Sequence, residues 1–181
     1  MARYVAFLRA INVGGRVVKM ERLRQIFEDL GLTSVETFIA SGNVVFNSRA
    51  SASTLERKIE NQLQVALGYE VATFVRSDAE VGTIADYPAF PPPKLHAPEA
   101  KLFIGFLSRA LDAKTQAKLL SFSTDTDEFH FNERELYWLC RGRLSDSKFS
   151  GALLEKTLGL RATVRNANTI RRLALKYPAI D

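Results

Sequence analysis

The residues best suited to binding chemistry form two separate groups of small polar and basic side chains. The first group follows an early apolar run and continues in a later turn, and it consists of Arg9, Asn12, Gly14, Gly15, Ser41, Gly42 and Asn43. Adjacent glycines let backbone amides converge on an anion, an arginine adds positive charge, and serine and asparagine add neutral hydrogen bonds. The same residue types also suit a tight loop and a tight hairpin without any ligand. Both interpretations stay open, because the spacing matches neither a phosphate loop nor the dinucleotide-binding fingerprint.

The second group lies near the C-terminus and consists of Lys148, Arg165, Asn166, Asn168 and Thr169. Residues 141–181 contain nine basic and three acidic side chains, whereas residues 1–140 contain 16 basic and 17 acidic ones, so the excess positive charge is C-terminal. Positive charge near two predicted helix starts, at 145–148 and at 168, can attract the phosphates of a small molecule or of a nucleic acid. Alternatively, Asp146 and Asn166 only cap helices, and Arg171, Arg172 and Lys176 form a solvated helix face.

Residues for catalysis or metal binding are few. The chain has one cysteine, Cys140, and two histidines, His96 and His130, with no nucleophile at a recognised spacing. This set is too small for a structural zinc site or an internal disulfide, so we expect no metal. Cys140 lies in an apolar strand and is interpreted as a small core residue. Tyr137 and Trp138 are neighbours on the same strand, so they point to opposite faces, and we expect one to be buried and the other partly exposed.

Hydrophobic periodicity predicts the elements that must position these groups. Before residue 79 the pattern predicts strands at 3–10, 34–40, 44–48 and 69–77 and helices at 19–31 and 52–68. After residue 100 it predicts strands at 101–108, 128–132, 135–141 and 161–166 and helices at 112–122, 145–159 and 168–177. Both halves therefore follow the order βαββαβ, and the second half adds a terminal helix.

The segment between the two halves is predicted to be a linker. Residues 87–100 hold five of the six prolines, and proline fits neither a helix interior nor a central strand. The predicted organisation is a first unit at 1–78, a helical and proline-rich linker at 79–99, and a second unit with the C-terminal helix at 100–181.

A βαββαβ unit with right-handed crossovers closes most simply as a four-stranded antiparallel sheet with two helices on one face, the ferredoxin-like arrangement. We therefore predict an α+β protein with two ferredoxin-like units, an internal duplication of the fold. Both faces of the first and fifth strands are apolar, which favours packing of the units into one compact body. In this topology the first and second strands of a unit end together, as do the third and fourth. The first group is then expected at one end of the first sheet, and the second group at one end of the second sheet.

Four motifs point to a known family. The segments YVAFLRAINVGG (4–15), MERLR (20–24), TFIASGNVVF (37–46) and TVRNANTI (163–170) together resemble the widespread bacterial family called domain of unknown function 1697. The resemblance spans nearly the whole chain and implies paired ferredoxin-like units, but it implies no activity, cofactor or catalytic residue. The family typically has glycine at the position of Ala10 and tryptophan at that of Ala167, so this chain departs from it at both positions.

Composition excludes several classes of protein. With 46% apolar and 25% charged residues, the chain is typical of a folded protein and not of a disordered tail. No segment approaches the roughly 20 consecutive apolar residues of a membrane-spanning helix, and arginines interrupt the N-terminal apolar run, unlike in a secretory signal. We therefore expect a cytoplasmic protein without a membrane partner.

Three functional hypotheses follow from these observations. The first is a binding protein for a small anionic or phosphorylated ligand held by one of the two groups. The second is a nucleic-acid-binding protein that uses the C-terminal basic surface. The third is an enzyme with its site between the two units, which would require a cleft with a strongly perturbed titratable group.

Overall fold

The computed structural model describes residues 1–12, 14–39, 42–142, 147 and 149–179. Its strands form two four-stranded sheets, and the chain divides into two units, Met1–Thr83 together with Leu173–Asp181, and Ile84–Arg172. The boundaries between the units fall within two helices, α3 (Asp78–Asp86) and α7 (Ala167–Lys176).

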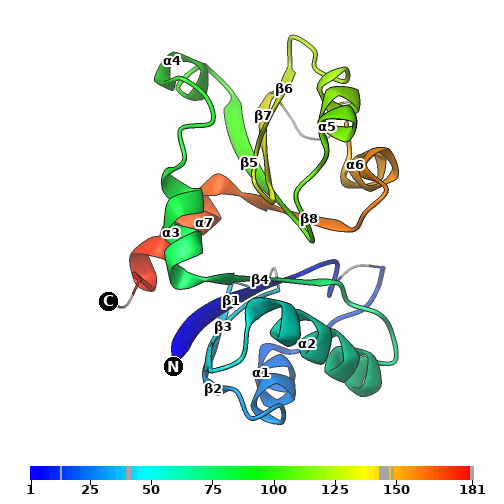
Figure 1. Cartoon of the computed structure of the whole chain (residues 1–181), viewed down its shortest axis with the longest axis vertical. Helices are drawn as coiled ribbons and strands as arrows, with labels where there is room; N and C mark the ends of the chain where they lie inside the picture. Colours follow the sequence, from blue (N-terminus) through cyan, green and yellow to red (C-terminus); the bar gives the residue numbers. More distant parts are fainter. Residues whose placement is uncertain (13, 40–41, 143–146, 148, 180–181) are drawn as a thin grey trace. The chain divides into compact units, whose positions relative to one another are not determined.

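The sheet of the first unit has the strand order β2-β3-β1-β4, and all of its neighbouring strands are antiparallel. Its elements are β1 (Ala2–Leu8), α1 (Met20–Glu28), β2 (Thr33–Phe38), β3 (Asn43–Ser48), α2 (Ala52–Leu67) and β4 (Thr73–Ser77). Figure 1 shows α1 and α2 side by side beneath this sheet. The order is that of a ferredoxin-like unit, as the sequence predicts.

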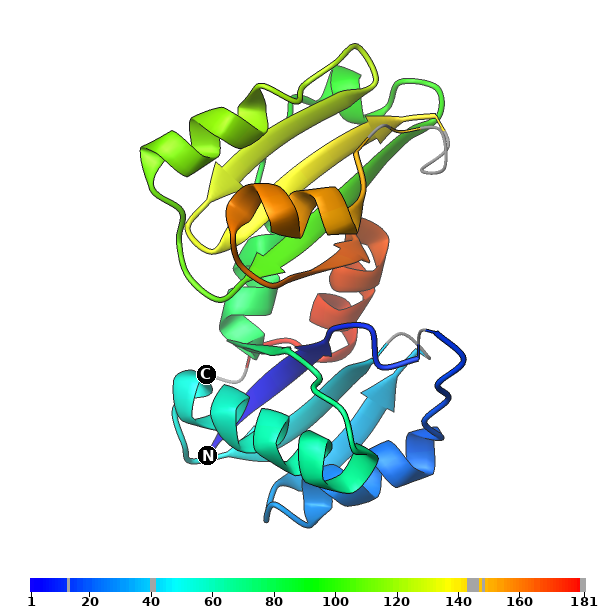
Figure 2. The same ribbon diagram turned by 90° about the vertical axis from the view of Figure 1, so that its right-hand side faces the viewer.

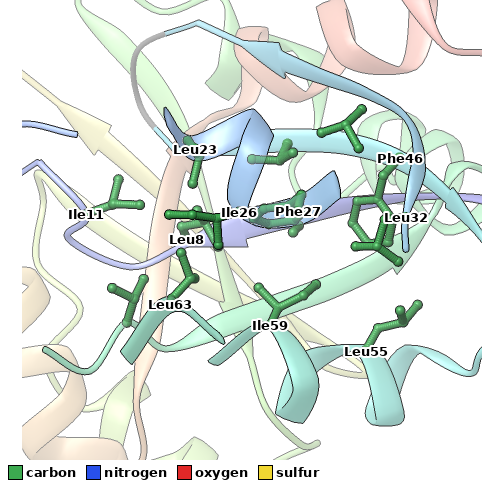
Figure 3. Packing of buried hydrophobic residues seen from close by; sticks show 14 of the residues in the cluster. Leu8, Ile11, Leu23, Ile26, Phe27, Leu32, Phe46, Leu55, Ile59 and Leu63 are labelled. Carbon is green, nitrogen blue, oxygen red and sulfur yellow. The ribbon is translucent and has the colours of Figure 1, made fainter. Parts of the chain in front are cut away.

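The helix-covered face of this sheet carries the main core of the first unit. The two helices bury apolar stripes at three- and four-residue steps, which are Leu23, Ile26 and Phe27 on α1 and Leu55, Ile59 and Leu63 on α2. These side chains point toward Leu8 and Phe46 of the sheet (Figure 3). A capping serine begins α2 and a left-handed glycine ends it, because Ser51 Oγ accepts the Thr54 amide and Gly68 has a φ of 79°.

The opposite face of the first sheet is also buried. Val5, Phe7, Val45 and Phe74 lie on this face and are almost fully enclosed. The end of α7 contributes Tyr177, whose ring lies 6.3 Å from that of Phe38. Burial on both faces agrees with the sequence of β1, because the residues that point to either face of this strand are largely apolar.

The second unit repeats the plan with the strand order β6-β7-β5-β8, again antiparallel throughout. Its elements are α4 (Pro92–Leu95), β5 (Ala100–Leu107), α5 (Ala113–Leu120), β6 (Asp127–Asn132), β7 (Glu135–Arg141), α6 (Gly151–Leu158) and β8 (Ala162–Asn166), which leads into α7. Figure 2 shows α5 and α6 together on one face of this sheet. The α+β class and the doubled βαββαβ order are therefore confirmed.

One predicted boundary is wrong. We predicted a helix from residue 145, whereas α6 begins at Gly151 and is capped by Ser150, whose Oγ accepts the Leu153 amide at 3.2 Å. The physical reason is that Phe149 is buried before the helix begins, with its ring 4.6 Å from Phe129. The predicted helix start at 145–148 is therefore not the start of α6, and most of those residues lie outside the described part of the chain.

Candidate functional site

A polar cavity lies in the second unit where β5 and α7 both begin. Its volume is about 300 Å³, and its lining comes from the end of α4, the start of β5 and the first turns of α7. We call it the β5–α7 cavity, and the residues that line it are Leu95, His96, Ala100, Lys101, Leu102, Asn166, Ala167, Asn168 and Arg171. Two of the predicted ligand residues, Asn166 and Asn168, are among them.

Strand pairing brings these distant residues together. In the antiparallel pairing of β5 with β8, Phe103 lies opposite Asn166, so the first residues of β5 lie beside the last residue of β8. Helix α7 follows β8 without a loop, as Figure 1 shows, because β8 ends at Asn166 and α7 starts at Ala167. Lys101 on β5 thereby comes to line the same cavity as the N-terminus of a ten-residue helix.

The hydrogen bonds at this helix start show how the asparagines are used. Asn166 Oδ1 accepts the backbone N–H of Asn168 at 2.9 Å, which is the capping role that the sequence offered as the alternative to ligand binding. Asn168 Oδ1 in turn accepts a hydrogen bond of 3.1 Å from Nη1 of Arg171. One N–H group of the guanidinium is thus held by a side chain of its own helix.

The charges around the β5–α7 cavity favour an anion. Lys101 and Arg171 are exposed cations, and the N-terminus of α7 adds the positive end of a helix dipole. Among the described residues that line the cavity there is no aspartate or glutamate. His96 adds a ring that can donate or accept a hydrogen bond.

Two other members of the second predicted group, Arg165 and Thr169, are not among the residues that line the cavity. Arg165 is buried on β8, where its Nη1 donates to Thr163 Oγ1 at 2.8 Å and to the Val164 carbonyl at 3.0 Å. Burial lowers the pKa of the Arg165 guanidinium to about 10, so it stays charged at neutral pH. Thr169 is half-buried in α7 and does not line the cavity. Lys148 lies outside the described residues.

Described residues of the first predicted group lie at one end of the first sheet. The Leu8 amide donates to the Gly42 carbonyl at 2.8 Å, which joins the loop after β1 to the β2–β3 hairpin. Gly42 has a φ of 76°, and a Cβ there would lie 2.9 Å from Cγ2 of Ile11. The glycine is therefore required by both its backbone angle and its close packing.

The asparagines of this first group hold the backbone. Asn12 Oδ1 accepts the Val18 amide at 2.8 Å and so closes the loop before α1. Asn43 is fully buried, and its Nδ2 donates to the Phe38 carbonyl at 3.0 Å across the hairpin. These contacts correspond to the structural interpretation of the group, in which the polar side chains support turns.

The remaining residues of the first group also lie in or beside the turns. Gly14 and Gly15 are exposed with φ values of 70° and 80°, conformations that suit glycine. Arg9 is half-buried, and its amide donates to the Ala72 carbonyl at 2.8 Å. Ser41 lies outside the described residues.

The aromatic and thiol side chains of β7 are part of the fold. Tyr137 and Trp138 point to opposite faces as predicted, but the expectation that one is partly exposed is wrong, since they are 1% and 3% exposed. Tyr137 is covered because Tyr87, from the predicted linker, stacks on it at 5.0 Å. Cys140 is buried in the core of the second unit. His130 Nε2 shares a hydrogen bond of 3.0 Å with the Tyr87 hydroxyl.

Sequence reasoning missed three polar residues of the β5–α7 cavity. His96 was assigned to the linker, Lys101 to a strand start and Arg171 to a solvated helix face. The signal that could have found Lys101 is topological, because in a ferredoxin-like unit the first strand starts beside the end of the fourth. Helical periodicity places Arg171 one turn after Asn168, on the same side of α7.

Two kinds of feature are missing from the described part of the chain. No three or more histidine, cysteine, aspartate or glutamate residues lie together so that they could hold a metal ion. Likewise, no helix in that part combines the length and apolar composition that crossing a membrane requires.

Of the comparisons with known proteins, one shows a family and another shows a similar structure. The family model described as "Protein of unknown function (DUF1697)" matches residues 1–137. The structure of the conserved bacterial protein SP0830 from Streptococcus pneumoniae is similar over 96% of this chain and 97% of that chain, with a TM-score of 0.73 and 28% sequence identity. None of the curated proteins matches the chain. The structural likeness extends over nearly the whole chain, including much that lies beyond the residues matched by the family model.

Proposed function

The chain belongs to the DUF1697 family, and we propose that it binds a small anionic ligand, with phosphate or a phosphorylated small molecule as the favoured class, in the β5–α7 cavity. The observation that carries the proposal is the lining of this cavity. It combines two cations, Lys101 and Arg171, with the N-terminus of α7, and none of its described lining residues is acidic. Helix N-termini and arginine forks are the groups that proteins use to bind phosphate and carboxylate.

The size of the cavity supports a small ligand. Its volume of about 300 Å³ lies at the lower end of the range for small-molecule sites. A single phosphorylated group with a short polar or apolar portion matches this space, and Leu95, Leu102 and Ala167 supply an apolar wall for such a portion.

The proposal is tested by titrating the protein with inorganic phosphate and following backbone amide shifts by NMR. We expect saturable shifts at the residues of the cavity, above all at the first turn of α7. Arg171→Gln and Lys101→Gln should each weaken binding about tenfold, because each removes one charge-assisted hydrogen bond. The matched controls are Arg109→Gln and Lys114→Gln, which change exposed residues of the same unit outside the cavity lining.

Two outcomes would contradict this function. One is the absence of saturable shifts at the cavity at millimolar phosphate. The other is an equal loss of affinity in the two control variants, which would indicate attraction to net charge alone. A short oligonucleotide that binds more tightly than phosphate, with a steep salt dependence and no sensitivity to Arg171→Gln, would favour nucleic-acid binding on another surface instead.

A further inference from the structure

One wall of the β5–α7 cavity is formed by α4, and this helix is too short to be stable without further contacts. Helix α4 has only four residues, Pro92–Leu95, and none of them is buried. Its backbone hydrogen bonds are those of a single turn: the Lys94 and Leu95 amides donate to the Pro91 carbonyl at 3.0 and 3.4 Å, and the His96 amide donates to the Pro92 carbonyl at 3.0 Å. A single exposed turn is unstable in isolation, so other contacts must hold it against the sheet.

An ion network provides such a contact. Lys94 Nζ lies 2.5 Å from Oε2 of Glu128 on β6, and the other carboxylate oxygen of Glu128 accepts a hydrogen bond from Nη2 of Arg141 at the end of β7. Arg141 is fixed further by a hydrogen bond of 2.9 Å from its Nη1 to the Asp125 carbonyl. The Glu128 side chain is 25% exposed, so the network is only partly open to solvent. Networks of several charges stabilise more than isolated surface pairs do.

The same network reaches two walls of the cavity. Lys94 directly precedes Leu95 and His96, which line the cavity from α4. Arg141 lies opposite Ala100 in the pairing of β7 with β5, and Ala100 also lines the cavity. Glu128 thus connects both walls, although it is not itself a lining residue.

We propose that Glu128 is a positioning residue of the β5–α7 cavity, which through Lys94 and Arg141 holds the α4 wall in the conformation that accepts an anion. The inference rests on the proposed function for its ligand, but the ordering of α4 is a separate property of the free protein. A preorganised wall strengthens binding because the ligand does not have to order α4 when it binds.

A charge effect alone predicts the opposite result for the same variant. Glu128→Gln removes a negative charge and leaves the positive charges of Lys94 and Arg141 uncompensated near the cavity. If Glu128 acted only through its charge, this variant would bind an anion more tightly. If Glu128 positions α4, the variant binds more weakly, so the sign of the change separates the two roles.

The experiment measures inorganic phosphate binding and backbone order in the same protein. We expect Glu128→Gln to weaken phosphate binding by about threefold to tenfold, as for the loss of a partly buried ion network. In the ligand-free variant, the order parameters of the Leu95 and His96 amides should fall from about 0.85 to below about 0.6. Lys94→Gln should give the same changes, and the double variant should be no weaker than either single one. Glu133→Gln, at the exposed turn between β6 and β7, is the control and should change neither quantity.

The outcomes are distinguishable. If the order parameters of the Leu95 and His96 amides are unchanged in Glu128→Gln, the positioning role is overturned, whatever the phosphate affinity of the variant. Equal or tighter phosphate binding by that variant overturns it as well. If the wild type does not bind phosphate but Glu128→Gln still disorders α4, the proposed function is overturned. The positioning of α4 by Glu128 is then retained.

Discussion

Tyr177, near the end of the described chain, donates a hydrogen bond of 2.6 Å to Glu36 Oε2 on β2, across 141 residues of sequence. Lys176 Nζ lies 3.2 Å from the same carboxylate oxygen. Arg3 contributes to the same cluster, since its guanidinium lies 5.8 Å from the centre of the Tyr177 ring and its Nη1 donates to the Pro178 carbonyl. This cluster holds the end of α7 on the first sheet.

Removing the Tyr177 hydroxyl should therefore destabilise the first unit. We expect Tyr177→Phe to lower the free energy of unfolding by about 1 kcal/mol, because one hydrogen bond to a charged but partly exposed group is lost. Urea unfolding at neutral pH measures the change. The control is Tyr4→Phe, since the Tyr4 ring stacks on Phe46 and no hydrogen bond of its hydroxyl is found within the described residues. An equal loss in both variants would contradict the role given to the Tyr177 hydroxyl.

The same cluster predicts a dependence of stability on pH. The hydrogen bond from Tyr177, followed by that from Lys176, lowers the pKa of Glu36 below its ordinary value of 4.5. A carboxylate whose pKa is lowered by folding stabilises the protein above its unfolded pKa, and this contribution is lost as the pH falls through the folded pKa. Unfolding free energies measured between pH 7 and pH 3 should show Glu36→Gln less stable than the wild type at pH 7. The difference should shrink below about pH 4.5.

A difference that stays constant across this range would contradict the assignment to Glu36. Glu133→Gln serves as the comparison, since that side chain is exposed at a turn of the second unit.

Two glycine substitutions separate backbone strain from steric overlap. Gly42 and Gly14 have similar φ values of 76° and 70°, but only at Gly42 would a Cβ overlap a neighbour, Cγ2 of Ile11 at 2.9 Å. We expect Gly14→Ala to cost about 1 kcal/mol and Gly42→Ala about 3 kcal/mol in unfolding free energy. Thermal or urea unfolding of both variants tests this, and equal costs would show that the loop relaxes around the added methyl group.

Ala10 offers a stabilising change. It has a φ of 52°, a left-handed conformation in which a Cβ is unfavourable. Ala10→Gly should raise the free energy of unfolding by about 0.5 kcal/mol, because the relief of strain exceeds the added flexibility of the unfolded chain. Ala117→Gly, in the exposed part of α5, should instead lower it by about 1 kcal/mol. Destabilisation by both changes would mean that the backbone at residue 10 is not strained.

Much of the fold could be predicted because its signals are local. The stripe of Leu55, Ile59 and Leu63 indicates a helix by its own spacing, and Gly68 marks the end of that helix. The doubled order βαββαβ leads to the observed strand orders because right-handed crossovers leave few alternatives. The α6 boundary was wrong because a core contact, that of Phe149, overrode a plausible local capping signal.

The candidate site could be predicted only in part. Asn166 and Asn168 are recognisable as polar residues at a helix start. Lys101, one of the two cations that line the cavity with them, comes from a strand more than 60 residues earlier. The described residues of the first group lie at one end of a sheet, yet the side chains of Asn12 and Asn43 hold turns there. Residue types indicate what a side chain can bind, whereas only its neighbours decide what it does bind.

The amino-acid sequence by itself determined the class of this protein, the order of its elements and the apolar stripes of its cores, because these depend on periodicity and on backbone preferences within a few residues. The tertiary structure alone decided which polar residues share a cavity and which carboxylate joins which cation. The physical reason is that these contacts depend on the register between strands that are distant in sequence. A shift of one residue in the pairing of β5 with β8 would move Lys101 to the other face of the sheet, away from α7.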